Sequence, residues 1–123
     1  MSTHNHKQVL VILSQTPYGG SLAREAIDYC LAAAAFEQNI NILFTGDAVL
    51  QLLKEQKPEG IYQKNVSKTL SALPMYGVEQ YYVEQDALKR YQLNENQLCL
   101  PITPVSSDQM ADLLNQANSV LNF

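Results

Sequence analysis

The feature that most constrains the fold is a continuous apolar run at residues 9–13 (VLVIL), which leads through a Pro/Gly turn into a helical pattern. A strand without polar alternation is buried on both faces of a sheet, and helices must then cover both faces. This junction predicts a parallel α/β domain. Ligands of open parallel sheets bind just beyond the carboxyl ends of the strands, so the turn after this strand is a candidate site. Its residues are Pro17, Tyr18, Gly19 and Gly20.

Apolar runs and amphipathic patterns alternate along the rest of the chain. Further strands are predicted at residues 40–44, 78–83, 97–102 and 119–123. Helices are predicted at residues 21–35, 48–53, 66–73, 84–91 and 106–117, the last opened by a Ser106–Gln109 capping box. Such alternation is typical of a three-layer α/β sandwich with a mostly parallel, five-stranded sheet.

Length and charge narrow the class of protein. The chain has 123 residues and a formal net charge of −4, which indicates one domain, expected at residues 7–123, without a general nucleic-acid surface. Residues 1–6 are expected to form a disordered polar tail, and they lack the apolar region of a secretory signal. No apolar run reaches the ~20 residues that span a bilayer. Two widely spaced cysteines suit a reducing, cytoplasmic location.

The chain contains few groups with obvious chemistry. Asp47 follows a strand and could bind a ribose or a metal ion, but it stands alone, and capping of the helix at 48–53 is its expected role. His4 and His6 could chelate a metal weakly, although the tail that carries them is expected to be disordered. Cys30 falls on an apolar helix stripe and Cys99 inside a predicted strand, where thiols are inert. No cofactor and no metal are therefore expected.

Two features of the sequence are candidates for contact with partner proteins. Exposed apolar patches usually mark contacts, and the apolar segment at residues 48–53 (AVLQLL) is one such candidate. Tyrosine is enriched at interfaces, and several tyrosines fall at strand ends, turns or helix starts. They are Tyr18, Tyr62, Tyr76, Tyr81 and Tyr82.

Three segments in order carry a family resemblance that covers the chain from about residue 7 to residue 123. They are TPYGG with AREAIDYCLAAAAF, then FTGDAVLQLLKEQKP, then MYGVEQYYVEQDALKRYQL. The chain resembles the DsrE/DsrF/DsrH-like sulfur-relay family, and within it the DsrF-like subunits. The resemblance implies a three-layer, flavodoxin-like arrangement and a hetero-oligomer with DsrE-like and DsrH-like subunits. It also implies passage of persulfide sulfur toward 2-thiolation of the tRNA wobble uridine, with tRNA contacted only indirectly by this acidic chain.

At one position this chain departs from the pattern of the DsrE-like subunits. DsrE-like subunits accept sulfur on a cysteine just past the third strand, and the matching position here is close to Glu84. A carboxylate suits a helix N-terminus but cannot accept sulfur. We therefore expect a non-catalytic subunit. Two alternatives stay open: a sulfurtransferase that carries persulfide on Cys99 or Cys30, and a small-molecule-binding domain that uses the Pro17–Gly20 turn and Asp47.

Overall fold

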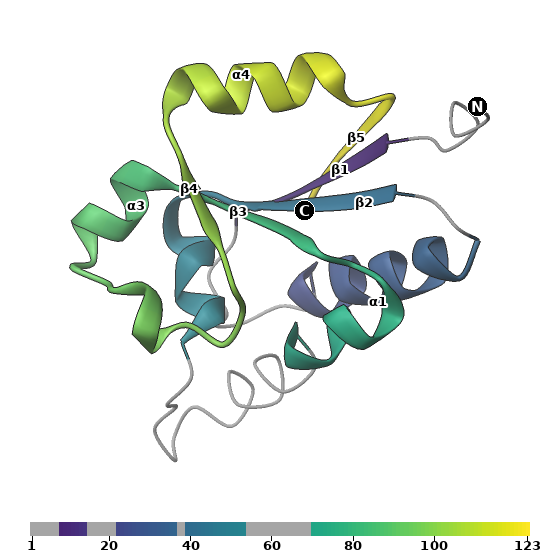
Figure 1. Ribbon diagram of the computed structural model, residues 1–123, viewed down its shortest axis with the longest axis horizontal. Coiled ribbons are helices and arrows are strands. Elements are labelled where there is room, and N and C mark those ends of the chain that lie inside the picture. The colour runs from purple at the N-terminus through teal and green to yellow at the C-terminus, as the bar shows by residue number, and fades with distance from the viewer. Residues whose placement is uncertain (1–7, 15–21, 37–38, 54–69) are drawn as a thin grey trace.

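The computed structural model describes residues 8–14, 22–36, 39–53 and 70–123 (Figure 1). Its centre is a five-stranded sheet in the order β4-β3-β2-β1-β5, and every neighbouring pair of strands is parallel. The predicted parallel α/β sandwich with five strands is confirmed. The strands are β1 (Gln8–Leu13), β2 (Asn39–Phe44), β3 (Gln80–Glu84), β4 (Thr103–Val105) and β5 (Ser119–Asn122).

Helices connect these strands. The α-helices are α1 (Leu22–Ala35), α3 (Gln85–Arg90) and α4 (Ser107–Gln116), and the 3-10 helices are η2 (Gly46–Leu52), η3 (Leu73–Tyr76) and η4 (Glu95–Gln97). The capping box predicted for α4 is present, because Ser106 Oγ accepts from the Gln109 N–H at 3.3 Å while Gln109 Oε1 accepts from the Ser106 N–H at 2.8 Å. None of the described helices is long and apolar enough to cross a membrane.

The predicted strand at residues 97–102 is wrong. Asn94 and Gln97 form a capping box around η4, and the fourth strand of the sheet begins only at Thr103. The error has a physical cause, because Leu98, Leu100 and Ile102 are buried while the residues between them are less so. Burial of every second residue imitates the pattern of a strand. Cys99 therefore lies in an irregular segment and not within the sheet.

The predicted helices at residues 48–53 and 66–73 need smaller corrections. The first is a 3-10 helix that begins two residues earlier, at Gly46. Most of the second lies outside the described residues, but residues 70–72 are helical and continue into η3. Pro74 lies at the start of η3, where a missing N–H costs little.

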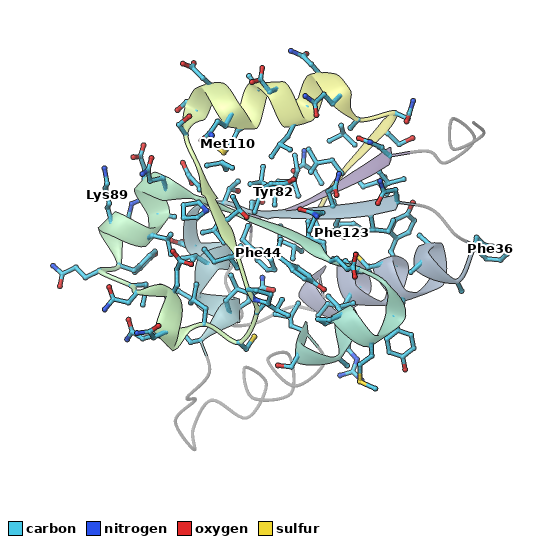
Figure 2. The ribbon with its side chains drawn as sticks, viewed as in Figure 1. Phe36, Phe44, Tyr82, Lys89, Met110 and Phe123 are labelled. Atoms are coloured by element: carbon cyan, nitrogen blue, oxygen red, sulfur yellow. The ribbon has the colours of Figure 1, made fainter. Side chains whose placement is uncertain are left out.

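Two unequal layers cover the sheet (Figure 1). The larger apolar core lies on the face that α1, η2 and η3 cover, and it includes Val11, Ile42, Phe44 and Val83. On the opposite face, α4 is the one described helix that packs over a small core of Leu10, Leu43 and Val105. Figure 2 shows Met110 of α4 and Tyr82 of β3 between this helix and the sheet. The strands are buried on both faces, as their continuous apolar runs predict.

The chain reverses its direction across the sheet once. It proceeds from β1 through β2 and β3 to β4, and then returns over the other face through α4 to place β5 beside β1. This order differs from the flavodoxin order of 2-1-3-4-5, although the layered arrangement is shared. Ser14 joins the ends of β1 and β5, since its N–H and its hydroxyl both donate to the backbone oxygen of Phe123, at 3.1 and 3.2 Å.

Candidate functional site

The carboxyl ends of β2 and β3 form the candidate site. Phe44 pairs with Val83, so the residues that follow these two strands are neighbours. Glu84 ends β3 and precedes α3, but its side chain does not cap that helix. Its Oε1 instead accepts a hydrogen bond of 2.8 Å from the Gly46 N–H in the connection after β2. Glu84 therefore links the ends of β2 and β3, and we call this Glu84–Gly46 hydrogen bond the clamp.

Gly46 is suited to this clamp by its backbone. Its φ is +52°, in the left-handed region that L-residues other than glycine enter only at a cost. A Cβ atom at this position would meet nothing within 4 Å, so the constraint on residue 46 is torsional and not steric. The preceding Thr45 is also fixed, because its N–H donates to the Leu13 carbonyl at 2.9 Å.

Asp47 lies beside this clamp and has a partner that the sequence did not reveal. The Tyr91 hydroxyl, which follows α3, donates a hydrogen bond to Asp47 Oδ1. This hydrogen bond raises the pKa of Tyr91 above its ordinary value. The expected capping role of Asp47 is wrong, because Thr45 is the N-cap of η2 and Asp47 lies within its first turn. No local signal links residues 47 and 91, since only the fold brings η2 and α3 into contact.

The two cysteines differ in exposure. Cys30 of α1 is buried in the larger core, as predicted, and burial raises its pKa to about 12. Cys99 is half-buried against the same core, and its N–H donates to the Leu52 carbonyl at 2.7 Å. Both thiols are free. Persulfide chemistry requires an accessible thiolate, which Cys30 does not provide.

Both cysteines affect the pKa of Tyr81. Burial raises its pKa, and Cys30, Glu79 and Cys99 act in the same direction. Its hydroxyl donates to the Val78 carbonyl inside the larger core. Tyr81 is therefore a core residue and not a partner-facing one. Tyr82, on the other face of β3, is half-buried below α4, whereas Tyr76 is 57% exposed.

The apolar segment at residues 48–53 is not a docking surface. Ala48, Val49 and Leu52 are fully buried, because η2 packs between the sheet and α3. The Pro17–Gly20 turn, Tyr62, His4 and His6 lie outside the described residues. Within the described ranges, no group of three or more His, Cys, Asp or Glu side chains could hold a metal ion.

One open groove of about 390 Å³ lies beside the candidate site. α3 and the turn after it form one wall, and Pro104 of β4 closes the other. Its lining combines the apolar residues Leu88, Leu93 and Pro104 with three carboxamides and one exposed cation, Lys89 (Figure 2). Asp47 does not line this groove.

The fold and the site together define a parallel α/β domain whose strand ends are tied by a carboxylate. The DsrE/DsrF-like family model matches residues 7–123. A TusC homologue of Pseudomonas aeruginosa is 36% identical over 117 residues, covering 95% of this chain and 98% of that protein. A TusC homologue of Vibrio parahaemolyticus is 33% identical, covering 94% of this chain and 98% of that protein. The chain belongs to the DsrE/DsrF-like family.

A solved structure supports the same fold. The YchN protein of E. coli superimposes with a TM-score of 0.76 over 95% of this chain and 99% of that chain. The two sequences are only 19% identical, so this likeness concerns the architecture alone.

Proposed function

We propose that this chain is a non-catalytic, TusC-like subunit of a sulfur-relay complex. The observation that carries the proposal is the hydrogen bond of Glu84, which lies close to the position where the family resemblance puts a sulfur-accepting thiol. The Glu84 carboxylate is engaged with the Gly46 N–H at 2.8 Å, so this position serves to hold two strand ends together. Cys30, with its raised pKa of about 12, does not replace the missing thiol.

The complex would contain DsrE-like (TusD-type) and DsrH-like (TusB-type) subunits, and it would deliver persulfide sulfur for 2-thiolation of the tRNA wobble uridine. The relatives named TusC homologues support this assignment. The chain would act in the cytoplasm and would need no cofactor. Its net charge of −4 supports only indirect contact with tRNA, because neutralisation of phosphates dominates nucleic-acid affinity.

The first experiment tests the partners. The chain is co-expressed with the DsrE-like and DsrH-like proteins of the same cell, and the assembly is isolated through a tag on this chain. We expect all three chains to co-elute at constant ratios. Elution of this chain without either partner would contradict the proposal.

The second experiment tests sulfur transfer, in which a donor persulfide passes its outer sulfur to an acceptor thiolate and leaves as a thiolate. The chain is incubated with a low-molecular-weight persulfide and weighed by mass spectrometry. We expect no gain of one sulfur atom, since Glu84 cannot accept it, Cys30 is buried, and Cys99 is half-buried and lies at no helix N-terminus. A gain that disappears in Cys99→Ser or Cys30→Ser would support the sulfurtransferase alternative instead.

A pair of variants tests whether residue 84 corresponds to the sulfur-accepting position of the family. Glu84→Cys places a thiol at the residue that precedes α3, where a helix N-terminus stabilises a thiolate. We expect this variant to gain a sulfur atom from the persulfide, whereas the matched exposed variant Glu79→Cys gains much less. Equal uptake by both variants would remove the equivalence between Glu84 and the sulfur-accepting position.

A further inference from the structure

α3 is too short to be stable by itself. It contains six residues, whereas isolated helices of fewer than ~12 residues are marginal in water. Its own hydrogen bonds end in a Schellman cap, in which the Gln92 N–H donates to the Lys89 carbonyl at 3.1 Å and the Leu93 N–H donates to the Leu88 carbonyl at 2.9 Å. The helix therefore persists only through its contacts with the rest of the molecule.

The apolar attachment of α3 is small. Its buried residues are Ala87 and Leu88, and only Leu88 carries a large side chain. The helix packs against η2 and against β3, the strand that precedes it. Figure 1 shows α3 at one end of the molecule, away from α1. Because the stabilisation from apolar burial grows with the area buried, these two side chains give α3 only a weak attachment to the fold.

Two side-chain hydrogen bonds strengthen this attachment, one at each end of α3. Before the helix, Glu84 accepts from the Gly46 N–H at 2.8 Å. After the helix, the Tyr91 hydroxyl donates to Asp47. Gly46 and Asp47 are the first two residues of η2, so both bonds fasten α3 to the same turn. All four residues are half-buried, and water can therefore replace either partner when a bond breaks.

The turn after α3 is suited to a change of conformation. Gln92 has a φ of +53°, and it is the one non-glycine residue with a positive φ among those that the structure describes. An L-residue adopts this conformation at a cost, which opening of the Schellman cap would relieve. Backbone strain of this kind is concentrated in segments that switch between two states. The chain is fixed again at the capping box of Asn94 and Gln97 around η4.

We propose that α3 opens from η2 while the sheet remains folded, and that the Glu84–Gly46 and Tyr91–Asp47 hydrogen bonds are the latch that holds it closed. Opening exposes the carboxyl ends of β2 and β3, where the ligands of open parallel sheets bind. It also removes the α3 wall of the groove of about 390 Å³. The latch therefore controls access to this end of the sheet. The proposal does not depend on the sulfur-relay function, because it concerns an equilibrium of this chain alone.

Native-state hydrogen exchange of the full chain tests the latch. The amides of Tyr91, Gln92 and Leu93 are the reporters, because each donates to a carbonyl of α3. In the wild type, we expect the reporters to exchange faster than the amides of β1 and β2. Their rates should hardly change at low urea concentrations, since the opening of one short helix exposes little surface.

Two variants separate the opening of α3 from global unfolding. Tyr91→Phe removes a bond that only the closed state contains, so we expect the reporters to exchange about three- to tenfold faster. Leu43→Ala weakens the small core below α4, which stays intact when α3 opens. We expect this variant to speed exchange in β1 and β2 at least about tenfold and to leave the reporters unchanged. If Leu43→Ala does not fold, the smaller truncation Leu43→Val makes the same comparison.

Tyr76→Phe is the matched control for the loss of a hydroxyl. Tyr76 of η3 is 57% exposed, and we expect its replacement to leave all of these rates unchanged. The proposal is overturned if the Leu43 variant speeds the reporters by the same factor as the strands, because α3 would then open only with the whole molecule. Reporter rates that stay unchanged in Tyr91→Phe also overturn it.

Discussion

At the residue scale, Glu84 has the clearest role. A carboxylate at the start of a helix usually caps that helix, but Glu84 reaches sideways to the Gly46 N–H after β2. It therefore connects the ends of β2 and β3 through two residues that are 38 positions apart in the chain. Removal of this one acceptor leaves a part-buried donor without its partner, which costs free energy.

Substitution of Glu84 tests this role. We expect Glu84→Ala to lower the free energy of unfolding by about 1 to 2 kcal/mol, and Glu84→Gln by less, because its amide oxygen can still accept. Urea unfolding followed by circular dichroism measures both. The control Glu79→Ala removes an exposed carboxylate before β3 and should change stability by less than about 0.5 kcal/mol. Equal losses for Glu84→Ala and Glu79→Ala would contradict the clamp.

Cys30 provides a pH-dependent prediction. Burial raises the pKa of its thiol from 9.0 to about 12, so the folded state favours the neutral thiol. This contribution to stability is present below pH 9 and is lost as the pH rises toward 12. In a Cys99→Ser background, we expect Cys30 to react with Ellman's reagent at neutral pH only after unfolding. Rapid reaction of the native protein would show that the thiol is accessible.

At the scale of elements, α4 is the helix that the sequence describes best. Its N-terminus satisfies two backbone N–H groups through the reciprocal bonds of Ser106 and Gln109. The segment at residues 97–102 is the opposite case, because the alternating burial around Leu100 suggested a strand that the sheet does not contain. Capping is a local interaction, whereas membership of a sheet depends on a partner strand.

The cap of α4 can be measured. We expect Ser106→Ala to lower the free energy of unfolding by about 1 kcal/mol, because the Gln109 N–H loses its acceptor. Ser107→Ala, at the first residue of α4, is the matched control and should be close to neutral. Thermal unfolding followed by circular dichroism gives both values. A loss in Ser107→Ala as large as that in Ser106→Ala would argue against the capping box.

At the scale of the whole molecule, the sheet separates two cores of different size. The face below α4 has three buried residues at its centre, whereas the other face holds most of the apolar side chains. Neither face can be solvated, since Leu10 and Leu43 are as deeply buried as Val11 and Ile42 on the other side. The small core below α4 is therefore necessary for the fold despite its size.

Truncation in the small core tests this point. We expect Leu43→Ala to lower the free energy of unfolding by about 2 to 5 kcal/mol, because Leu43 is 2% exposed and its loss leaves a cavity. Circular dichroism and tyrosine fluorescence should still follow one transition in urea. Met75→Ala, at a side chain that is 86% exposed, should have little effect. Loss of α4 alone, in a separate first transition, would show that the two layers unfold independently.

Local patterns were sufficient for the architecture. The apolar runs at β1 and β2 and the helical pattern of α1 predict buried parallel strands covered by helices, because strands buried on both faces are apolar throughout. The capping box of α4 and the burial of Cys30 follow from neighbours within a few residues. These features require no knowledge of which strands pair.

The candidate site depends on long-range contacts. Glu84 meets Gly46, and Asp47 meets Tyr91, only because β2 and β3 pair in parallel and bring their carboxyl ends together. The open edge at β5 likewise follows from the strand order, which places the last strand outside β1. The periodicity of apolar residues predicts which residues are buried, but not which residues they contact. The Glu84–Gly46 clamp and the β5 edge are therefore visible only in the folded chain.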